Sequence, residues 1–444
     1  MSAVDSPGDA PWPPRRAAWT AVAILALANF FAFIDRILMS LLIQPIKVDW
    51  NLTDTEASLL LGLAFGLFYT LLAIPIGRLV DGWSRKSVAA LGLAFWSMAA
   101  VACGAAHNFV QLFIARVGVG AGEASLNPAS YSILSDYFPK RQLSSAIGIY
   151  TMAAFLGAGV ALIGGGYVLR AFTAHGPFDV PMLGQLAPWQ MTFVVLAAPG
   201  LVVALLCMMI KEPARRGAGE AQASFGEAMR FMRTEPQRWA FFFLIAAFAV
   251  HTFGSYAGSG WTLTFFIRTF GWSPQEAGLY TGLTFLIFGA GGALAGGWYG
   301  DRLRQRGHLD AQLRAAQIGI WISWPMGLFS TLVPDAAAAV ALNAGAMFFS
   351  TFVYPLAASA IQTITPNRMR GQASAVYLTV INLVGLGLGP LVIGMLNDYG
   401  FKSPQAIGLS LAIVNGITPP LMAVLLALGL KHYRAAVAAS EAQP

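Results

Sequence analysis

The chain has 444 residues, of which 57% are hydrophobic and only 11% are charged. Soluble domains carry about 25% charged residues, so the composition excludes a soluble domain of any size and indicates a polytopic membrane protein. The two cysteines, Cys103 and Cys207, both lie in apolar runs, which gives neither a disulfide framework nor a metal-binding spacing. We therefore expect no metal and no cofactor.

In chain order, residues 1–16 are rich in Pro and Asp and are predicted to form a disordered cytoplasmic tail. Twelve apolar segments follow, each long enough to cross a bilayer as a helix. They are predicted at 17–47, 55–80, 86–106, 109–136, 142–170, 189–210, 238–268, 274–300, 313–333, 336–363, 371–397 and 404–430. The polar segment 211–237 is predicted to be a cytoplasmic linker with a short amphipathic piece near Phe225–Met232, and residues 434–444 to be a second cytoplasmic tail.

The positive charges indicate how the helices are oriented. If the N-terminus is cytoplasmic, 21 of the 27 Lys and Arg residues fall in cytoplasmic loops and tails and four fall outside, while Arg36 and Arg116 lie within segments. This bias predicts that both termini are cytoplasmic. The net charge of +7 is therefore an orientation signal, and we expect no nucleic-acid partner.

An internal repeat divides the chain. Identical residues recur 220 positions apart in the second and eighth segments, and 227 positions apart around the fifth and eleventh. The pairs include Glu56/Glu276, Gly62/Gly282, Phe65/Phe285, Gly77/Gly297, Asp81/Asp301, Arg141/Arg368 and Tyr150/Tyr377. The sequence thus predicts an all-α membrane protein of twelve helices in two six-helix bundles, 17–210 and 238–433. Parallel repeats of this kind are typical of transporters, with the binding site near the bilayer midplane.

Four full charges lie within the predicted membrane segments, and all are in the first bundle. Asp35 and Arg36 occur in helix 1, and Arg116 and Glu123 occur in helix 4. Charges at bilayer depth are costly, so such residues indicate a functional site and tend to be paired. Either carboxylate is a candidate for taking up a proton. The alternative is a structural Arg–Glu pair that holds two helices together, and both interpretations can hold.

The helix-4 stretch RVGVGAGEASLNP, residues 116–128, has two distinct faces. Helical spacing puts Arg116, Gly120, Glu123 and Asn127 on one face, where Gly120 is predicted to leave an open polar groove. Gly118, Gly122 and Ser125 fall on the opposite face and predict a close packing seam. In helix 1, Asn29 shares a face with Arg36 and Asp35 points about a quarter-turn away, so either Arg36 or Asp35 faces the cavity.

The loop after helix 2 reads GRLVDGWSRK over Gly77–Lys86, and the second half repeats it as GWYGDRLRQR over Gly297–Arg306. This pattern resembles the signature of the major facilitator superfamily. The resemblance implies a cytoplasmic gate in which acidic and basic side chains latch the two halves. The residues predicted for this gate are Gly77, Asp81, Arg85, Gly297, Asp301 and Arg302.

The helix-1 Asp-Arg pair, together with the helix-4 Arg and Gly-Glu-Ala-Ser, resembles the spinster branch of that superfamily, and the anion:cation symporter branch shares most of it. The resemblance implies that Asp35 and Glu123 are proton sites, and that Arg36 and Arg116 partner those sites or an anionic substrate. Spinster-like proteins are associated with export of lysolipids and sphingoid lipids, and the sister branch with proton-driven uptake of sugar acids and aromatic acids.

Further cavity candidates are mostly polar or aromatic. In the first bundle they are Asn29, Tyr69 and Asn127, and in the second His251, Tyr256, Phe352 and Asn382. Gly258 and Gly260 predict a local break in helix 7. For His251 and Phe352 the alternatives are an ordinary buried hydrogen bond and helix packing. With its charges in one half, the predicted cavity is ionic on one wall and apolar on the other, which suits an amphiphilic anion.

We therefore predict a proton-coupled secondary transporter that works by alternating access. Its expected partners are a small-molecule or lipid substrate, protons and membrane lipids, and we expect a monomer in a bacterial inner membrane. No metalloprotease, serine-hydrolase or Cys/His motif supports the alternative of a membrane-embedded enzyme. A channel and a non-transporting sensor remain as further alternatives, and the sequence leaves open the substrate, the direction of transport, and symport, antiport or uniport.

Overall fold

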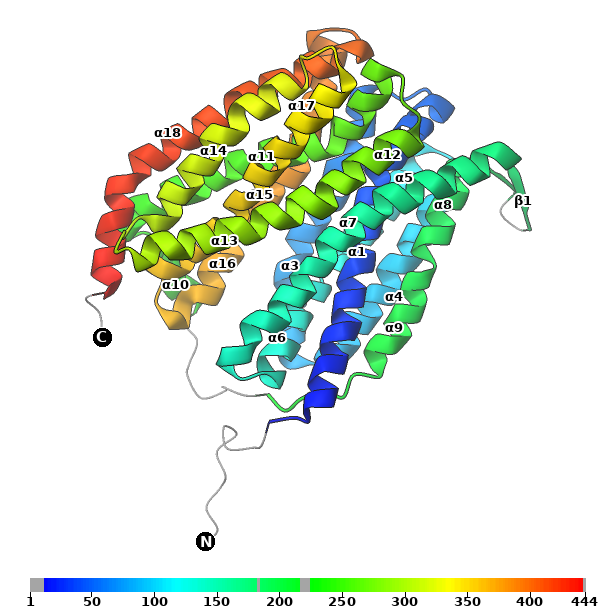
Figure 1. Ribbon diagram of the computed structural model, residues 1–444. Coiled ribbons are helices and arrows are strands. Elements are labelled where there is room, and N and C mark those ends of the chain that lie inside the picture. Colours follow the sequence, from blue (N-terminus) through cyan, green and yellow to red (C-terminus); the bar gives the residue numbers. More distant parts are fainter. Residues whose placement is uncertain (1–11, 182–183, 216–223, 442–444) are drawn as a thin grey trace. The chain divides into compact units, whose positions relative to one another are not determined.

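The computed structural model describes residues 12–181, 184–215 and 224–441, which are almost entirely helical (Figure 1). Within these residues, eleven helical stretches are long and apolar enough to cross a membrane. A further 20-residue helix, α14 (Ala311–Ser330), covers the ninth predicted segment. Each of the twelve predicted segments is thus helical, and the predicted all-α membrane fold is confirmed. The predicted tail residues 1–11 and 442–444 lie outside the described residues.

The chain divides into two compact units. Unit 1 comprises residues 1–52, 59–220 and 273–282, and unit 2 comprises residues 53–58, 221–272 and 283–444. Most of each unit is one half of the internal repeat. Two short segments are exchanged, because 53–58 from the first half belongs to unit 2 and 273–282 from the second half belongs to unit 1.

Unit 1 consists of long helices and a small hairpin. Its helices are α1 (Arg15–Trp50), α3 (Ala64–Gly82), α4 (Arg85–Gly104), α5 (Phe109–Glu123), α6 (Leu126–Tyr137), α7 (Lys140–His175), α8 (Pro188–Ala197), α9 (Pro199–Met208) and most of α12 (Pro274–Leu283). Strands β1 (Phe178–Val180) and β2 (Gly184–Leu186) pair antiparallel, with Phe178 opposite Leu186. The helices pack through apolar side chains, and α1 lies against α7.

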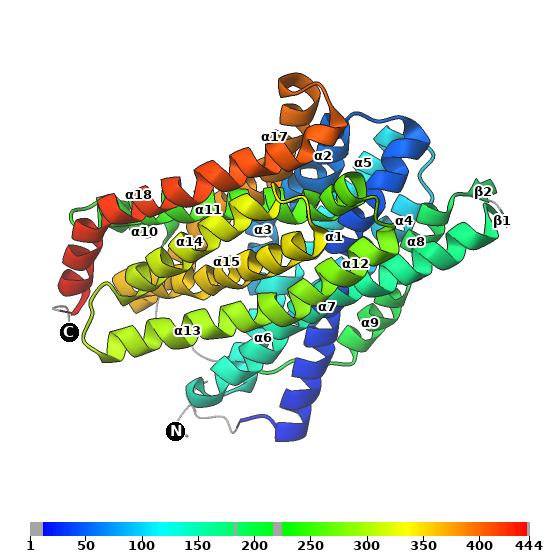
Figure 2. The ribbon, with the colours of Figure 1, turned by 45° about the horizontal axis from the view of Figure 1, so that its top comes forward.

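Unit 2 contains the remaining helices. They are α2 (Asp54–Ser58), α10 (Phe225–Met232), α11 (Gln237–Phe270), α13 (Ala290–Gln305), α14, α15 (Ala336–Ile364), α16 (Arg370–Ile381), α17 (Gly389–Met395) and α18 (Ile407–Glu441). Figure 2 shows α18 lying along α11 and α14, with which it packs most closely. Helix α10 coincides with the predicted amphipathic piece and begins with a capping box between Ser224 and Glu227. Because α18 continues to Glu441, residues 434–441 extend the last helix.

Wider π-helical turns interrupt several helices, and two of them lie in corresponding helices of the two halves. One, Leu59–Leu63, joins α2 to α3, and another, Thr284–Gly289, joins α12 to α13. Two more lie at Asn382–Leu388 and Leu396–Gly400. Such turns are commonly found at functional sites. The first two also mark where the exchanged segments leave one unit and the chain continues into the other.

Candidate functional site

Arg36 and Glu123 form an ion pair within unit 1. The Arg36 guanidinium donates through Nη2 to Glu123 Oε1, which joins α1 to α5. Both side chains are buried, with 10% of Arg36 and 3% of Glu123 exposed. Three aromatic rings surround the guanidinium, whose Cζ lies 4.8, 4.7 and 5.3 Å from the ring centroids of Phe33, Phe65 and Tyr69. Ring faces attract cations, so this aromatic cage holds the Arg36 cation in place beside its carboxylate.

Asp35 lies on a different side of α1 and is only 1% exposed. Neither of its carboxylate oxygens has a hydrogen-bond partner within the described structure. Arg116, also 1% exposed, donates from Nη1 to the backbone oxygen of Asp35 at 3.2 Å rather than to its carboxylate. Of the two predicted orientations, Arg36 therefore faces the more open side and Asp35 is enclosed. The two carboxylates consequently have different surroundings, since Glu123 forms an ion pair, whereas Asp35 forms none among the described residues and has the Trp96 indole beside it.

The helix-4 stretch is interrupted rather than continuous. Helix α5 ends at Glu123, a turn covers 124–125, and α6 begins at Leu126. The groove predicted at Gly120 is wrong, because a Cβ there would lie 2.4 Å from the backbone oxygen of Phe65. Gly120 instead lets α3 approach α5 closely, which brings the Phe65 ring over Arg36. The predicted seam on the other face is present, since a Cβ at Gly122 would lie 2.8 Å from atoms of Trp96 in α4.

Asn127 joins three helices by hydrogen bonds. Its Nδ2 donates to the Tyr69 hydroxyl at 3.1 Å, and its Oδ1 accepts from the Tyr150 hydroxyl at 2.6 Å. Asn29 donates to the backbone oxygen of Tyr150 at 2.8 Å. The predicted candidates Asn29, Tyr69 and Asn127 thus meet around Tyr150, which the sequence did not single out. Its recurrence as Tyr377 in the repeat was an available signal.

The aromatic cage was also missed, apart from Tyr69. Phe65 and Tyr69 are four residues apart in α3 and stack at 5.4 Å between ring centroids. This spacing places both rings on one helix face. Two aromatic residues at that spacing, in a chain with two membrane-embedded arginines, are the pattern that could have predicted the cage.

Arg85, which was predicted for the gate, is buried and makes its polar contacts inside unit 1. It pairs with Asp136 of α6, donates from its backbone N to Glu212 Oε1 at 2.8 Å, and donates from Nη2 to the Pro213 oxygen at 2.6 Å. The side chain of Asp81 lies outside the described residues. A Cβ at Gly77, also predicted for the gate, would meet no atom within 4 Å, so this glycine makes no close helix contact with the described residues.

The corresponding loop in unit 2 is more open. Asp301 and Arg302 are exposed, and the Arg302 Cζ lies 5.3 Å from the Trp298 ring centroid. A Cβ at Gly297 would meet Pro355 only at 4.0 Å. The close approach in this helix is at Gly296, where a Cβ would overlap the Phe352 backbone.

His251 is buried in unit 2 beside Tyr354. Its Nε2 lies 3.1 Å from the Ser350 oxygen, and the two rings are 5.2 Å apart. The Tyr354 hydroxyl donates to Ser255 at 2.8 Å. The break predicted in this helix at Gly258 is wrong, because α11 is continuous from Gln237 to Phe270. A helix keeps its backbone hydrogen bonds satisfied in an apolar setting, which favours continuity.

The other candidates in the second half are Phe352, Tyr256 and Asn382. Phe352 is 7% exposed and packs within the apolar core of unit 2 against Tyr299 and Phe349, as the packing alternative predicted. Tyr256 is half-buried on α11, and Asn382 is half-buried at the start of a π-helical turn.

Comparisons with known proteins agree with this architecture. Residues 25–390 match the family model of the Major Facilitator Superfamily. The chain is 28% identical over 433 residues to an MFS-type efflux pump of Mycolicibacterium smegmatis, with 95% of this chain and 94% of that protein covered. It is 24% identical over 424 residues to a probable L-galactonate transporter of Escherichia coli, with 88% of each covered.

Among solved structures, the chain resembles a bacterial homologue of the human lysosomal transporter Spinster, crystallised in an inward-facing and unoccupied conformation. The TM-score is 0.78 at 25% identity, with 96% of this chain and 98% of that chain covered. The family match spans most of the chain, and the predicted resemblance to spinster proteins is confirmed. The chain therefore belongs to the Major Facilitator Superfamily, and it is a multi-pass membrane transporter rather than an enzyme.

Proposed function

We propose that the protein is a proton-coupled secondary transporter of an amphiphilic organic anion, working by alternating access. The observation that carries this proposal is the buried Arg36–Glu123 pair inside its aromatic cage. A buried charge whose partner is removed is strongly unfavourable. Arg36 is therefore most stable beside an anion, and it has one in Glu123 when no substrate is bound.

Protonation of Glu123 supplies the coupling. A neutral Glu123 no longer balances Arg36, so the guanidinium becomes a site for the carboxylate or phosphate of a substrate. Loss of the proton restores the ion pair and expels the substrate anion. Proton and substrate thus occupy Arg36 and Glu123 together or leave together, which is the thermodynamic requirement for symport.

Asp35 is proposed as a second proton site. Its oxygens are buried, form no ion pair in the described structure and have the Trp96 indole beside them, and an ionised carboxylate is costly in such a place. We propose that it is neutral in this conformation and that it ionises when rearrangement brings the Arg116 side chain to it. Arg116 already contacts the backbone of Asp35, so the required movement is short.

The proposed substrate class follows from the surroundings of Arg36. The cation supplies an anion site, the three rings of the cage supply apolar contact, and the Asn127 network supplies hydrogen-bonding groups nearby. These features suit a small organic acid with an apolar part, or a lysolipid-like molecule. Two relatives correspond to these two classes, because one is named as a probable L-galactonate transporter and the other as a bacterial homologue of Spinster.

Binding by the purified protein separates these two classes. Aromatic acids, sugar acids and lysolipids are each added at two pH values, and the melting temperature is measured, since a ligand of the native state raises it. Stabilisation by a small carboxylate, stronger at one pH, supports the organic acid. Stabilisation only by single-chain lipids, beyond a detergent control, supports the lysolipid.

Transport itself is tested in liposomes. Counterflow of a labelled ligand distinguishes a transporter mechanism from a sensor that only binds. Uptake driven by a pH gradient tests proton coupling, and loss of the gradient effect with transport retained would indicate a uniporter. We further propose residence in a bacterial inner membrane with both termini cytoplasmic, function as a monomer, and a cytoplasmic gate at the Gly77–Lys86 and Gly297–Arg306 loops.

A further inference from the structure

A group of basic residues in unit 2 lacks the acidic partners that its neighbours have. Arg238, at the start of α11, and Lys431, in the last part of α18, are both exposed and form no ion pair with any described residue. Arg434, three residues after Lys431, pairs with Asp310 at 2.5 Å, and Arg314 pairs with the same carboxylate at 2.7 Å. Unlike Arg314 and Arg434, Arg238 and Lys431 are therefore available to an anion from outside the protein.

An aromatic ring lies beside Arg238, and further rings surround His432, the residue after Lys431. The Arg238 Cζ is 5.0 Å from the ring centroid of Trp239. The His432 ring is 6.3 Å from Trp239 and stacks on Phe243 at 6.0 Å, and Phe242 is 5.8 Å from Trp239. We name Trp239, Phe242, Phe243 and His432 the aromatic ledge. Trp and other amphipathic rings are enriched where the membrane meets water.

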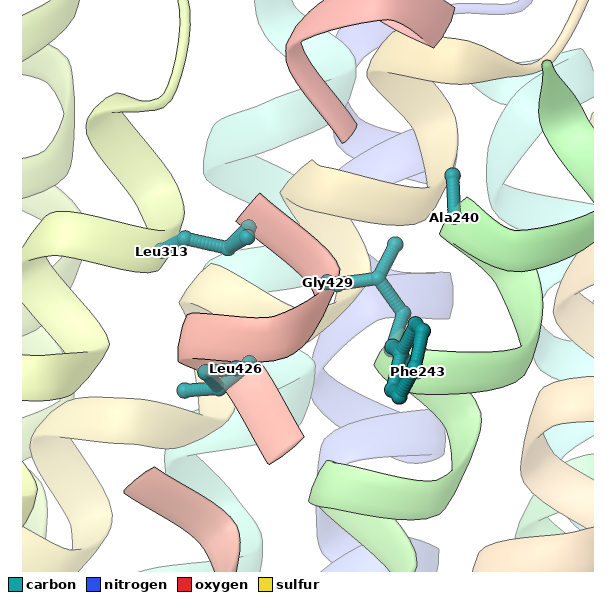
Figure 3. Close-up of a pocket in the computed structure, with 6 residues that line it drawn as sticks. Ala240, Phe243, Leu313, Leu426 and Gly429 are labelled. Carbon is teal, nitrogen blue, oxygen red and sulfur yellow. The ribbon is translucent and has the colours of Figure 1, made fainter. Parts of the chain in front are cut away.

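Gly429 allows the aromatic ledge to pack closely against α18. A Cβ at Gly429 would lie 2.6 Å from the Phe243 Cβ, so only glycine lets Phe243 lie against this helix. Figure 3 shows Gly429 and Phe243 among the residues that line a small crevice. The crevice is narrow and is lined by Ala240, Phe243, Leu244, Leu313, Leu426 and Gly429. The crevice is apolar throughout, and Phe243 and Gly429 form part of its wall next to His432.

An exposed apolar surface continues from the ledge along the helices. On α18, Leu421, Val424 and Leu428 are 44%, 53% and 57% exposed, and Phe242 on α11 is 54% exposed. The spacing of three or four residues puts the α18 side chains on one face, and Lys431 follows three residues after Leu428. One continuous surface is thus apolar over several turns and cationic at its end.

We propose that this edge of α11 and α18 is a specific binding site for an acidic phospholipid. Arg238, Lys431 and His432 would bind the phosphate, and the acyl chains would lie along Phe242 and Leu428. Clustered basic residues at the membrane surface attract anionic lipids, and the unpaired charges give this site a preference for an acidic over a zwitterionic headgroup. In the proposed orientation the site faces the cytoplasmic leaflet, and it requires no assumption about the transported substrate.

The test measures lipid retention by native mass spectrometry. The full-length protein in detergent is mixed with equal amounts of dioleoylphosphatidylglycerol and dioleoylphosphatidylcholine. We expect the wild type to retain the acidic lipid by roughly fivefold or more over the zwitterionic one. The variant Arg238→Gln/Lys431→Gln should lose this preference, and Arg238→Lys/Lys431→Arg, which keeps both charges, should retain it.

A matched control separates a site from a general charge effect. Arg306→Gln/Arg368→Gln removes two exposed cations elsewhere in unit 2 and should leave the preference unchanged. The proposal is overturned if the wild type shows no preference, if the Arg238/Lys431 variant keeps it, or if the control loses as much. Should the double Gln variant not fold, Arg238→Gln and Lys431→Gln are measured singly, each expected to reduce the preference.

Discussion

Asp54 and Arg268, 214 residues apart in the chain, form a two-point ion pair inside unit 2. Nη1 of Arg268 lies 2.8 Å from Asp54 Oδ2, and Nη2 lies 2.8 Å from Oδ1. Asn397 adds a third hydrogen bond to Asp54 at 2.8 Å and accepts one from Ser410 at 2.6 Å. Asp54 is completely buried, so every one of these contacts is shielded from water.

This pair holds an exchanged segment in place. Asp54 begins α2, whose residues belong to unit 2 although the chain continues at Leu59 into unit 1. Asp398 accepts from the backbone N and the hydroxyl of Thr55, at 2.6 and 2.7 Å, and so binds the same turn. The first turn of the second membrane helix is therefore attached to the other half of the repeat by a satisfied buried network.

Removing one partner of this pair should be strongly destabilising. Asp54→Ala leaves Arg268 buried without its carboxylate, and such a loss costs about 3–5 kcal/mol. We expect a clear fall in the melting temperature of the purified protein. The double variant Asp54→Asn/Arg268→Gln leaves no lone charge. Its loss of stability should be smaller than the sum of the losses in Asp54→Asn and Arg268→Gln measured singly. Additive effects would show that the two residues are not coupled.

Glu123→Gln should abolish proton-coupled transport while leaving the protein folded. The amide cannot carry the proton, and Arg36 keeps a hydrogen-bonding neighbour of the same size. We expect pH-gradient-driven uptake into liposomes to fall to that of empty liposomes, whereas substrate binding persists. Glu235→Gln, which removes an exposed charge, is the control. If Glu123→Gln keeps full gradient-driven uptake, Glu123 is structural and Asp35 becomes the sole carboxylate candidate.

The helices could be predicted from sequence because an apolar run of about 20 residues has one low-energy form in a bilayer. The linker helix α10 was equally predictable, since Ser224 and Glu227 form a capping box beside an amphipathic run. The membrane charges likewise marked Asp35, Arg36, Arg116 and Glu123 as candidates, each within its own apolar segment, but not which of them pair. What these signals share is that each depends on residues close together in the chain.

Contacts between distant segments could not be read in the same way. Helical spacing put Gly120 on the face of Arg116 and Glu123, but it could not show that Phe65 of another helix occupies the space. The Asp54–Arg268 pair was missed for the same reason, because both residues sit at the ends of predicted segments where charges are common. Gly258 was taken for a helix break, although the surroundings of α11 keep it helical.

Gly120→Ala tests the corrected role of that glycine. The added Cβ would lie 2.4 Å from the Phe65 backbone oxygen, and overpacking of this kind costs about 1–3 kcal/mol. We expect a lower melting temperature and weaker ligand binding, because Phe65 moves away from Arg36. In Gly77→Ala the new Cβ meets no atom within 4 Å, so the melting temperature should be unchanged or slightly higher. Equal destabilisation by both changes would contradict this account.

Glu212 gives a prediction for pH dependence outside the membrane segments. Partial burial by itself raises its pKa, but hydrogen bonds from Ser84 and from the backbone and side chain of Arg85 outweigh burial and hold the pKa below the usual 4.5. A carboxylate with a lowered pKa stabilises the folded state above its unfolded value, and this contribution is lost as the pH falls through the folded value. The stabilisation should therefore be complete above pH 4.5 and decline below it.

The comparison of Glu212→Gln with the wild type measures this contribution. Melting temperatures are recorded in steps from pH 7 to the lowest pH at which the wild type stays folded. We expect the wild type to be more stable by a constant margin above pH 4.5, with the margin shrinking at lower pH because protonated Glu212 resembles glutamine. Glu235→Gln should show no such margin. A margin for Glu212→Gln that is the same at every pH would mean that the side chain acts through packing rather than through its charge.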